Sequence, residues 1–328
     1  LQASVSNLPP VVFGADALPD APDRVIVLLG GGQTAKVGNE LPLRPTLLVV
    51  DRFGNLLEGV PVTFEVKVGG GTIEGGSQLS GPGGVVVSGP WTLGPTAGIQ
   101  TLEIQAPGLE PLTLTAIAEP GPPAQALAQG GGLQTATVGR EVEDPPTVRV
   151  EDAYGNPVPN VRVTFSPFGS PDMDGSPGVI GGPDSMTDEM GVASAESWSL
   201  GTRAGAYSAS AEVHGLAETV TFFATAVADS PFSMAVASGD NQTTQSGAAL
   251  AVPPSVRVED QFGNGVSQVP VEFVVVEGGG VVSAGRVNTG WDGIATVEGW
   301  TLGPTPGVNL LTASVEGLGT VTFRATGL

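Results

Sequence analysis

Alternating apolar and polar residues mark out short strands along the chain. Residues 61–68 read Pro-Val-Thr-Phe-Glu-Val-Lys-Val, which places apolar side chains on one face of an extended strand and polar ones on the other. Residues 161–165 and 269–275 repeat this alternation. The sequence shows no apolar spacing of the kind that predicts a helix. The pattern therefore predicts half-buried strands joined by turns, and an all-β fold.

A five-residue motif, Asp-x-Phe/Tyr-Gly-Asn, occurs at residues 51–55, 152–156 and 260–264. Each copy lies 13 residues before a Phe that ends a strand, and each is followed by a Trp-Thr/Ser-Leu-Gly signature. Three copies of one unit of roughly 100 residues account for nearly the whole chain. We expect three β-sandwich domains after a short N-terminal extension. The predicted boundaries are 1–21 for the extension and 22–120, 123–228 and 231–328 for the domains.

The repeated aspartates Asp51, Asp152 and Asp260 are predicted to shape turns. Gly-Asn tolerates positive φ, and the Asp three residues before the Gly can bond the turn's backbone, so the motif predicts a hairpin connection. The alternative is a pair of carboxylates for glycoside hydrolysis, with Glu151 and Glu259 beside two of the aspartates. Active sites are normally built once per chain, whereas this motif returns in every unit. The turn interpretation is therefore favoured.

The Trp of each signature, at Trp91, Trp198 and Trp300, lies two residues before a Leu. Both side chains then project to the same side of a strand, which predicts a Trp buried against the opposite sheet. The linkers at residues 119–123 and 228–231 are short and contain proline. Linkers of this kind are stiff and favour an extended rod.

These features together resemble the group 1 bacterial immunoglobulin-like domain, the type that occurs in tandem in invasin and intimin adhesins. The likeness is carried by Val-x-Asp/Glu-Asp-x-Phe/Tyr-Gly-Asn, by Gly-x-Ala/Val before Trp-Thr-Leu-Gly-Pro, and by the final Thr-Phe-x-Ala-Thr. It covers about residues 22–328. The resemblance implies immunoglobulin-like sandwiches that serve as extracellular stalk or spacer domains, without enzymatic activity and without an obligatory cofactor.

Composition limits the partners and the compartment. The net charge is −21, from 33 acidic against 12 basic residues, and a surface this acidic repels nucleic acid and anionic lipid. No apolar run approaches the roughly 18 residues of a membrane helix, so we expect no membrane span. The absence of cysteine excludes disulfides and thiolate sites. The chain starts at Leu1 rather than Met, which fits removal of a signal peptide and a secreted or cell-surface protein.

Few residues of this chain are candidates for catalysis or metal binding. His214 falls just before a turn glycine and is expected to be exposed and without a catalytic or metal-binding role, since the chain has no second His. Asp172 and Asp174 faintly resemble a calcium loop, with Asp184, Asp188 and Glu189 nearby. The distal Glu of an EF-hand is missing, so a plain surface loop is favoured over calcium binding. The glycine runs at residues 30–32 and 130–132 end strands and are predicted to be bends between sheets.

In the N-terminal extension, residues 11–18 alternate as a short strand that includes Val11, Val12 and Phe13. Either this segment is a free leader or it adds a strand to the sheet edge of a neighbouring copy.

Taken together, these features predict a non-enzymatic extracellular structural protein whose copies join head to tail, through residues 1–21 and the third domain, into a filament or surface layer. The alternative is an adhesin stalk or ectodomain that binds a host protein or carbohydrate, with Trp291 as the contact residue.

Overall fold

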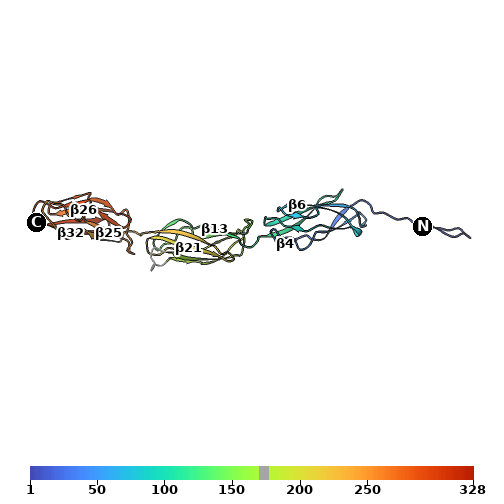
Figure 1. Ribbon diagram of the computed structural model, residues 1–328, viewed down its shortest axis with the longest axis horizontal. Helices are drawn as coiled ribbons and strands as arrows, with labels where there is room; N and C mark the ends of the chain where they lie inside the picture. The colour runs from blue at the N-terminus through green and yellow to red at the C-terminus, as the bar shows by residue number, and fades with distance from the viewer. Residues whose placement is uncertain (170–176) are drawn as a thin grey trace. The chain divides into compact units, whose positions relative to one another are not determined.

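The computed structural model describes residues 1–169 and 177–328 (Figure 1). Within these residues the regular structure is β-strand, apart from a 3₁₀ turn at Pro82–Gly84. None of the helical structure described is long and apolar enough to cross a bilayer. The predicted all-β fold is confirmed.

The chain divides into two compact units, Leu1–Gln125 with Glu151–Val158, and Ala126–Val150 with Pro159–Leu328.

One pattern of three sheets repeats along the described chain. In residues 231–328 the three-stranded sheet has the order β23-β25-β29, the five-stranded sheet β24-β32-β31-β26-β28, and the two-stranded sheet β27-β30. The strands pair antiparallel except β24, which runs parallel to β32. Their bounds are β23 (Ser233–Ser238), β24 (Gln242–Thr244), β25 (Ser255–Glu259), β26 (Pro270–Glu277), β27 (Val281–Ser283), β28 (Arg286–Asn288), β29 (Ile294–Thr296), β30 (Gly299–Thr301), β31 (Gly307–Val315) and β32 (Gly319–Gly327).

The same orders occur earlier in the chain, as β3-β5-β9, β4-β12-β11-β6-β8 and β10-β7, and again as β13-β15-β19, β14-β22-β21-β16-β18 and β17-β20. The first set comprises β3 (Arg24–Leu29), β4 (Gln33–Lys36), β5 (Thr46–Val50), β6 (Pro61–Val68), β7 (Thr72–Ile73), β8 (Ser77–Leu79), β9 (Val85–Val87), β10 (Trp91–Thr92), β11 (Gly98–Gln105) and β12 (Leu112–Glu119). The second comprises β13 (Gln125–Gly130), β14 (Gln134–Thr137), β15 (Thr147–Glu151), β16 (Arg162–Gly169), β17 (Val179–Gly181), β18 (Asp184–Met186), β19 (Val192–Ser194), β20 (Ser197–Ser199), β21 (Gly205–Val213) and β22 (Thr219–Val227).

Each set of sheets closes around a hydrophobic core. In residues 231–328, Val256 and Val258 of the three-stranded sheet join Phe273, Leu311 and Phe323 of the five-stranded sheet in one buried cluster. Neighbouring positions along these strands are exposed or half-buried, as period-two alternation requires. The two sheets therefore pack face to face as a sandwich. A matching cluster, built around Trp91, fills the sandwich of the first set.

The tryptophans of the repeated signature are buried as expected. Trp91, Trp198 and Trp300 are fully covered, and the Leu two residues after each of them is buried too. Their indole rings are among the largest completely buried side chains in the molecule. Because aromatic rings of this size dominate the apolar area of a small core, each signature supplies the centre of its sandwich.

Gly30 lets the first strand of a sandwich change sheets. The chain leaves β3 in the three-stranded sheet and enters β4 in the five-stranded sheet within four residues. Gly30 has φ of 95°, and a Cβ there would lie 2.5 Å from Cα of Pro45. Only glycine fits such a position without displacing backbone. The prediction that the first glycine run forms a bend between sheets is confirmed.

The Asp-x-Phe/Tyr-Gly-Asn turn differs from the prediction in one respect. It was expected to join paired strands as a hairpin, but β5 before it and β6 after it belong to different sheets. The same holds for β15 and β16 and for β25 and β26. The turn itself reverses the chain as predicted, because Val50 and Leu56 form an antiparallel bridge across it, as do Glu151 with Pro157 and Glu259 with Gly265. The chain then crosses to the other sheet, so the two long strands on either side of the turn are not partners in one hairpin.

The first 21 residues form a small hairpin of their own. β1 (Gln2–Ala3) and β2 (Val11–Val12) pair antiparallel, and the side chains of residues 1–20 are exposed. The backbone N–H of Phe13 donates to the carbonyl of Leu1, which extends the pairing beyond the two short strands. The predicted strand at Val11 and Val12 is thus present, paired within the extension.

Candidate functional site

The repeated aspartate turn is held together by hydrogen bonds to its carboxylate. One oxygen of Asp152, Oδ1, accepts from the backbone N–H groups of Tyr154 (2.8 Å) and Asn156 (2.9 Å). The other, Oδ2, accepts from the backbone N–H of Gly121 in the linker (2.8 Å) and from Nδ2 of Asn156 (2.9 Å). A carboxylate with this many donors is engaged on both oxygens, so it closes the turn and ties down the linker.

The other two copies of the turn repeat this arrangement. Asp51 accepts from the backbone N–H groups of Phe53, Asn55 and, in the segment before the first sandwich, Asp20. Asp260 accepts from those of Phe262, Asn264 and Asp229. The three carboxylates belong to separate copies of the turn, each with its own set of donors. This arrangement supports the turn interpretation over a shared pair of catalytic carboxylates.

The donors around each carboxylate govern its pKa. Burial alone raises the pKa of Asp51, but hydrogen bonds from the Asn55 side chain and from backbone N–H groups outweigh burial and lower the pKa to about 2. Burial opposes the same kinds of hydrogen bond at Asp152 and Asp260, and the pKa of each is again lowered. Carboxylates with lowered pKa values are ionised at neutral pH and poorly suited to act as general acids.

The final Asn of the motif reaches a second loop in two of the three copies. Oδ1 of Asn156 accepts from the backbone N–H of Ala97 (2.9 Å), and its Nδ2 donates to the carbonyl of Pro95 (2.7 Å). Oδ1 of Asn264 accepts from the backbone N–H of Ala204 (2.8 Å), and its Nδ2 donates to the carbonyl of Thr202 (2.8 Å). Both contacted loops follow a Trp-x-Leu-Gly signature. In these two copies the motif therefore hydrogen-bonds to the loop that follows the Trp-x-Leu-Gly signature of the preceding repeat.

Asn55, in the first copy, makes a smaller set of bonds. Its Nδ2 donates to Oδ2 of Asp51 at 2.8 Å, and its side chain is exposed, whereas Asn156 and Asn264 are buried. The sequence identified the motif but not the loops that it clasps. The recurrence of Asn after Gly was the available signal, since Gly alone meets the conformational need of the turn.

Trp291 is the most prominent exposed aromatic residue. Its relative exposure is 90%, and it occupies a tight turn in which the N–H of Gly293 donates to the carbonyl of Gly290. Beside it lies a shallow hollow of about 460 Å³ that Arg257 and Asp292 also line. Trp291 is therefore exposed, as a residue that contacts a binding partner should be. An exposed indole beside charged groups is a surface that sugars and protein side chains can stack on.

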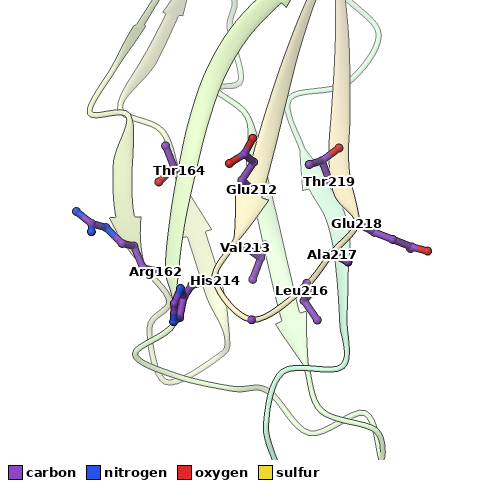
Figure 2. Close-up of a pocket in the computed structure, with 10 residues that line it drawn as sticks. Arg162, Thr164, Glu212, Val213, His214, Leu216, Ala217, Glu218 and Thr219 are labelled. Carbon is purple, nitrogen blue, oxygen red and sulfur yellow. The ribbon is translucent and has the colours of Figure 1, made fainter.

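A second hollow, of about 390 Å³, surrounds the only histidine of the chain. Figure 2 shows His214 beside Arg162, with Glu218 pointing away from the other labelled side chains. His214 is exposed in the turn between β21 and β22, as predicted. A similar hollow occurs at the equivalent turn of residues 231–328, where Glu316 replaces the histidine. The hollow is thus a feature of the repeated hairpin turn rather than a site built around His214.

The calcium candidates Asp172 and Asp174 lie outside the described residues. Of the nearby acids, Asp184 accepts from Oγ1 of Thr164 (2.7 Å) and lies 3.5 Å from Nε of Arg162. Asp188 accepts from the backbone N–H groups of Met190 and Val192, which makes it a turn residue. Across residues 1–169 and 177–328, no three acidic, His or Cys side chains gather as a metal site. The expectation of a plain surface loop, and the calcium alternative to it, are therefore both untested.

The extension residues Val11, Val12 and Phe13 are all more than half exposed. Together with Leu1 and Val5 they give the hairpin an uncovered apolar surface. Apolar side chains exposed in a group mark surfaces that meet another protein surface. Trp291 and these three residues belong to different compact units of the chain.

The sandwiches and the repeated turn define a class, the tandem immunoglobulin-like β-sandwich. No family model and no curated protein matches the chain. Among solved structures, the chain is similar to the Escherichia coli adhesin FdeC, with 16% identity and a TM-score of 0.53 over 95% of this chain and 100% of that one. It is also similar to InvD of Yersinia pseudotuberculosis (14% identity, TM-score 0.49, covering 89% and 94%) and to invasin, a bacterial integrin-binding protein (17%, 0.44, covering 93% and 60%). The resemblance to bacterial immunoglobulin-like adhesin domains is confirmed at the level of the fold.

Proposed function

We propose that this chain is a non-enzymatic structural section of a bacterial cell-surface protein, in which the sandwiches act as spacers. One observation carries the proposal. The motif residues that return in every repeat use their polar atoms on backbone groups of the turn, the linker and the preceding loop. Residues engaged in this way position sandwiches along a chain rather than transform a substrate.

The fold supports an extracellular location, because it is similar to that of the bacterial adhesin FdeC. A net charge of −21 also disfavours contact with nucleic acid. The proposed location is tested by labelling intact cells of the producing bacterium with antibodies against residues 231–328. Labelling of intact cells supports the proposal, and labelling only after lysis contradicts it.

The spacer role is tested by stretching single molecules. A load-bearing sandwich unfolds as a unit, so each repeat of about 100 residues should release about 33 nm of contour length in a separate event. Three such events are expected from residues 22–328. Extension without discrete events would contradict the spacer role.

A head-to-tail filament is a second candidate, favoured by the uncovered apolar surface of residues 1–13. In such a filament the extension of one copy would meet the third sandwich of the next. Electron microscopy and sedimentation of the purified chain, with and without residues 1–21, test this candidate. Polymers that disappear on deletion support it, and chains that remain monomeric at high concentration contradict it.

An adhesin ectodomain is the alternative that Trp291 favours, since an indole this exposed is available to a carbohydrate or protein. Binding of the chain to a glycan array and to host-cell extracts should then fall in Trp291→Ala. Met190→Ala is the matched control, because Met190 is also exposed in the equivalent turn of the preceding repeat. Equal binding by both variants would remove Trp291 from the contact surface.

A further inference from the structure

The first 18 residues match the last 18 residues of the chain without a gap. Residues 1–18 read LQASVSNLPPVVFGADAL, and residues 311–328 read LTASVEGLGTVTFRATGL. Half of the positions are identical, and most of the shared residues occupy alternate positions along a strand. They are Leu1, Ala3, Ser4, Val5, Leu8, Val11, Phe13, Ala15 and Leu18, which correspond to Leu311, Ala313, Ser314, Val315, Leu318, Val321, Phe323, Ala325 and Leu328.

The two segments also share their hairpin geometry. Gln2 pairs with Val12 and Ala3 with Val11, while Thr312 pairs with Thr322 and Ala313 with Val321, which is the same register. The N–H of Leu8 donates to the carbonyl of Val5 at 3.1 Å, and the N–H of Leu318 donates to that of Val315 at 3.1 Å.

The turns agree as well. Asn7 has φ of 74° where Gly317 has φ of 82°, and both lie at the same place in the alignment. Asparagine is among the few residues other than glycine that tolerate this conformation. Residues 1–18 therefore form the same kind of hairpin as β31 and β32, the hairpin that closes the third sandwich.

The two hairpins differ in what covers them. Leu311 and Phe323 are completely buried in the core of the third sandwich. The corresponding Leu1 and Phe13 are 94% and 55% exposed. The N-terminal hairpin thus carries the inward face of a sandwich, and the described chain supplies no opposite sheet for it.

The linker after the hairpin shows where such a sandwich belongs. Seven residues after Phe13, the N–H of Asp20 donates to Oδ2 of Asp51 (3.0 Å). Seven residues after Phe222, its counterpart in β22, the N–H of Asp229 donates to Oδ2 of Asp260 (2.9 Å). The linker between the N-terminal hairpin and the first sandwich therefore makes the same hydrogen bond as the linker between the second and third repeats.

Asn55 gives a second and independent indication. Its counterparts Asn156 and Asn264 are buried because each clasps the loop of a preceding repeat. Asn55 has the same position in its turn and remains exposed. A preceding repeat would provide a loop to which the Asn55 side chain could hydrogen-bond, as Asn156 and Asn264 do.

We propose that residues 1–18 are the closing hairpin of a fourth immunoglobulin-like sandwich, which precedes the first in the same polypeptide. The rest of that sandwich covers the apolar face of the hairpin, and it corresponds to residues 231–310 of the third repeat. Two observations favour a preceding sandwich over a second copy of the chain: the hydrogen bond from Asp20 to Asp51, and the exposure of Asn55. A second copy would explain only the exposed apolar face of the hairpin. The inference does not depend on the proposed function.

The sequence before Leu1 provides the most direct test. In each repeat the buried Trp lies 11 residues before the residue equivalent to Leu1: Trp91 before Leu102, Trp198 before Ala209 and Trp300 before Leu311. The natural polypeptide should therefore carry a Trp 11 positions before Leu1, preceded by an Asp-x-Phe/Tyr-Gly-Asn motif. A polypeptide that begins at Leu1, or that lacks both features, overturns the proposal.

A grafting experiment tests whether the hairpin can complete a sandwich. Residues 231–310 are placed directly before Leu1 of the full chain, which reproduces the native junction between residues 310 and 311. Hydrogen exchange at the amides of Ala3 and Phe13 should then slow by at least about 100-fold, because these amides join a cooperative core. Phe13→Asp in the grafted chain should restore fast exchange there and leave the other sandwiches unchanged.

A positive control and a concentration series complete the test. In the control, residues 231–328 are placed before Pro19, so that the native hairpin replaces residues 1–18. If the control folds while the graft onto residues 1–18 stays unprotected, the proposal is overturned. It is also overturned if the ungrafted chain protects the amides of residues 1–18 increasingly with concentration and sediments as an oligomer, because a second copy is then the occupant.

Discussion

The side-chain oxygen of Asn264 accepts a hydrogen bond from the backbone N–H of Ala204, 60 residues earlier in the chain, at 2.8 Å. The amide nitrogen of the same side chain donates to the carbonyl of Thr202 and to Asp260. A single buried amide thus joins the turn of one repeat to the loop between β20 and β21 of the repeat before it. Asn156 makes the corresponding bonds to Ala97 and Pro95.

Removal of this amide should loosen the junction. In Asn264→Ala the bonds to Ala204, Thr202 and Asp260 are lost, which we expect to cost about 2 kcal/mol, at about 0.5–1.5 kcal/mol for each hydrogen bond. The amide proton of Ala204 should exchange at least about tenfold faster, since about 1.4 kcal/mol corresponds to a factor of ten. Hydrogen exchange followed by NMR measures this rate. Asn55→Ala is the matched control, because Asn55 is exposed and donates to Asp51 alone among described residues.

The carboxylates of the repeated turn should make the fold sensitive to acid. The folded pKa of Asp51 is about 2, below the ordinary value of about 3.9 for an unfolded chain. A lowered folded pKa stabilises the protein above the unfolded value, and this contribution is lost as the pH falls from about 4 to about 2. NMR titration of the carboxyl carbon should place the midpoint of Asp51 near 2. The urea midpoint of the first sandwich should fall over the same range, and less steeply in Asp51→Asn. A midpoint for Asp51 near 3.9 would contradict the hydrogen bonding described.

Much of the fold follows from the sequence because its signals are local. Alternation at residues 61–68 identifies β6, and the Trp-x-Leu spacing identifies a buried pair, since both depend only on which face of a strand a residue occupies. The partner of each strand was not predictable in the same way. The motif at residues 51–55 predicts the reversal of the chain, but nothing local shows that the next strand, β6, pairs in the other sheet rather than with β5.

The interaction sites were predictable only in part, for the same physical reason. The exposure of Trp291 follows from its place in a Gly-Trp-Asp-Gly turn, which has no strand alternation to bury it. The hydrogen bonds from Asn156 and Asn264 reach a loop about 60 residues earlier in the chain, and no local sequence pattern indicates that contact. The kinship of residues 1–18 with residues 311–328 is present in the sequence but concealed by the small size of the segment.

The buried tryptophans should tolerate phenylalanine better than alanine. Within the described residues the indole Nε1 of Trp300 is buried and has no hydrogen-bond acceptor, so Trp300→Phe loses volume without breaking a hydrogen bond. We expect a cost of about 1–2 kcal/mol for Trp300→Phe and about 3–5 kcal/mol for Trp300→Ala. Exchange rates of core amides in β31, measured in increasing denaturant, report the stability of this sandwich. Equal losses in the two variants would show that the indole contributes more than its size.

Trp291 should dominate the solvent-accessible fluorescence. The chain has four tryptophans, of which three are completely buried and Trp291 is 90% exposed. Acrylamide reaches only exposed rings in a folded protein, so Trp291→Phe should abolish most of the quenching while the remaining emission stays shifted to shorter wavelength. Persistent strong quenching in this variant would mean that one of the other rings is reached by solvent.

The bend at Gly30 should be far less tolerant of a side chain than the glycine two residues later. Both have positive φ, 95° at Gly30 and 69° at Gly32, so alanine costs about 1–2 kcal/mol of backbone strain at either position. At Gly30 the new Cβ would also lie 2.5 Å from Cα of Pro45, whereas at Gly32 no atom lies within 4 Å. Gly30→Ala must therefore displace the backbone that connects the two sheets, and we expect a loss of about 3 kcal/mol or more. Exchange of the β5 amides measures the stability of this sandwich in each variant, and similar rates in Gly30→Ala and Gly32→Ala would show that the close approach to Pro45 does not constrain the bend.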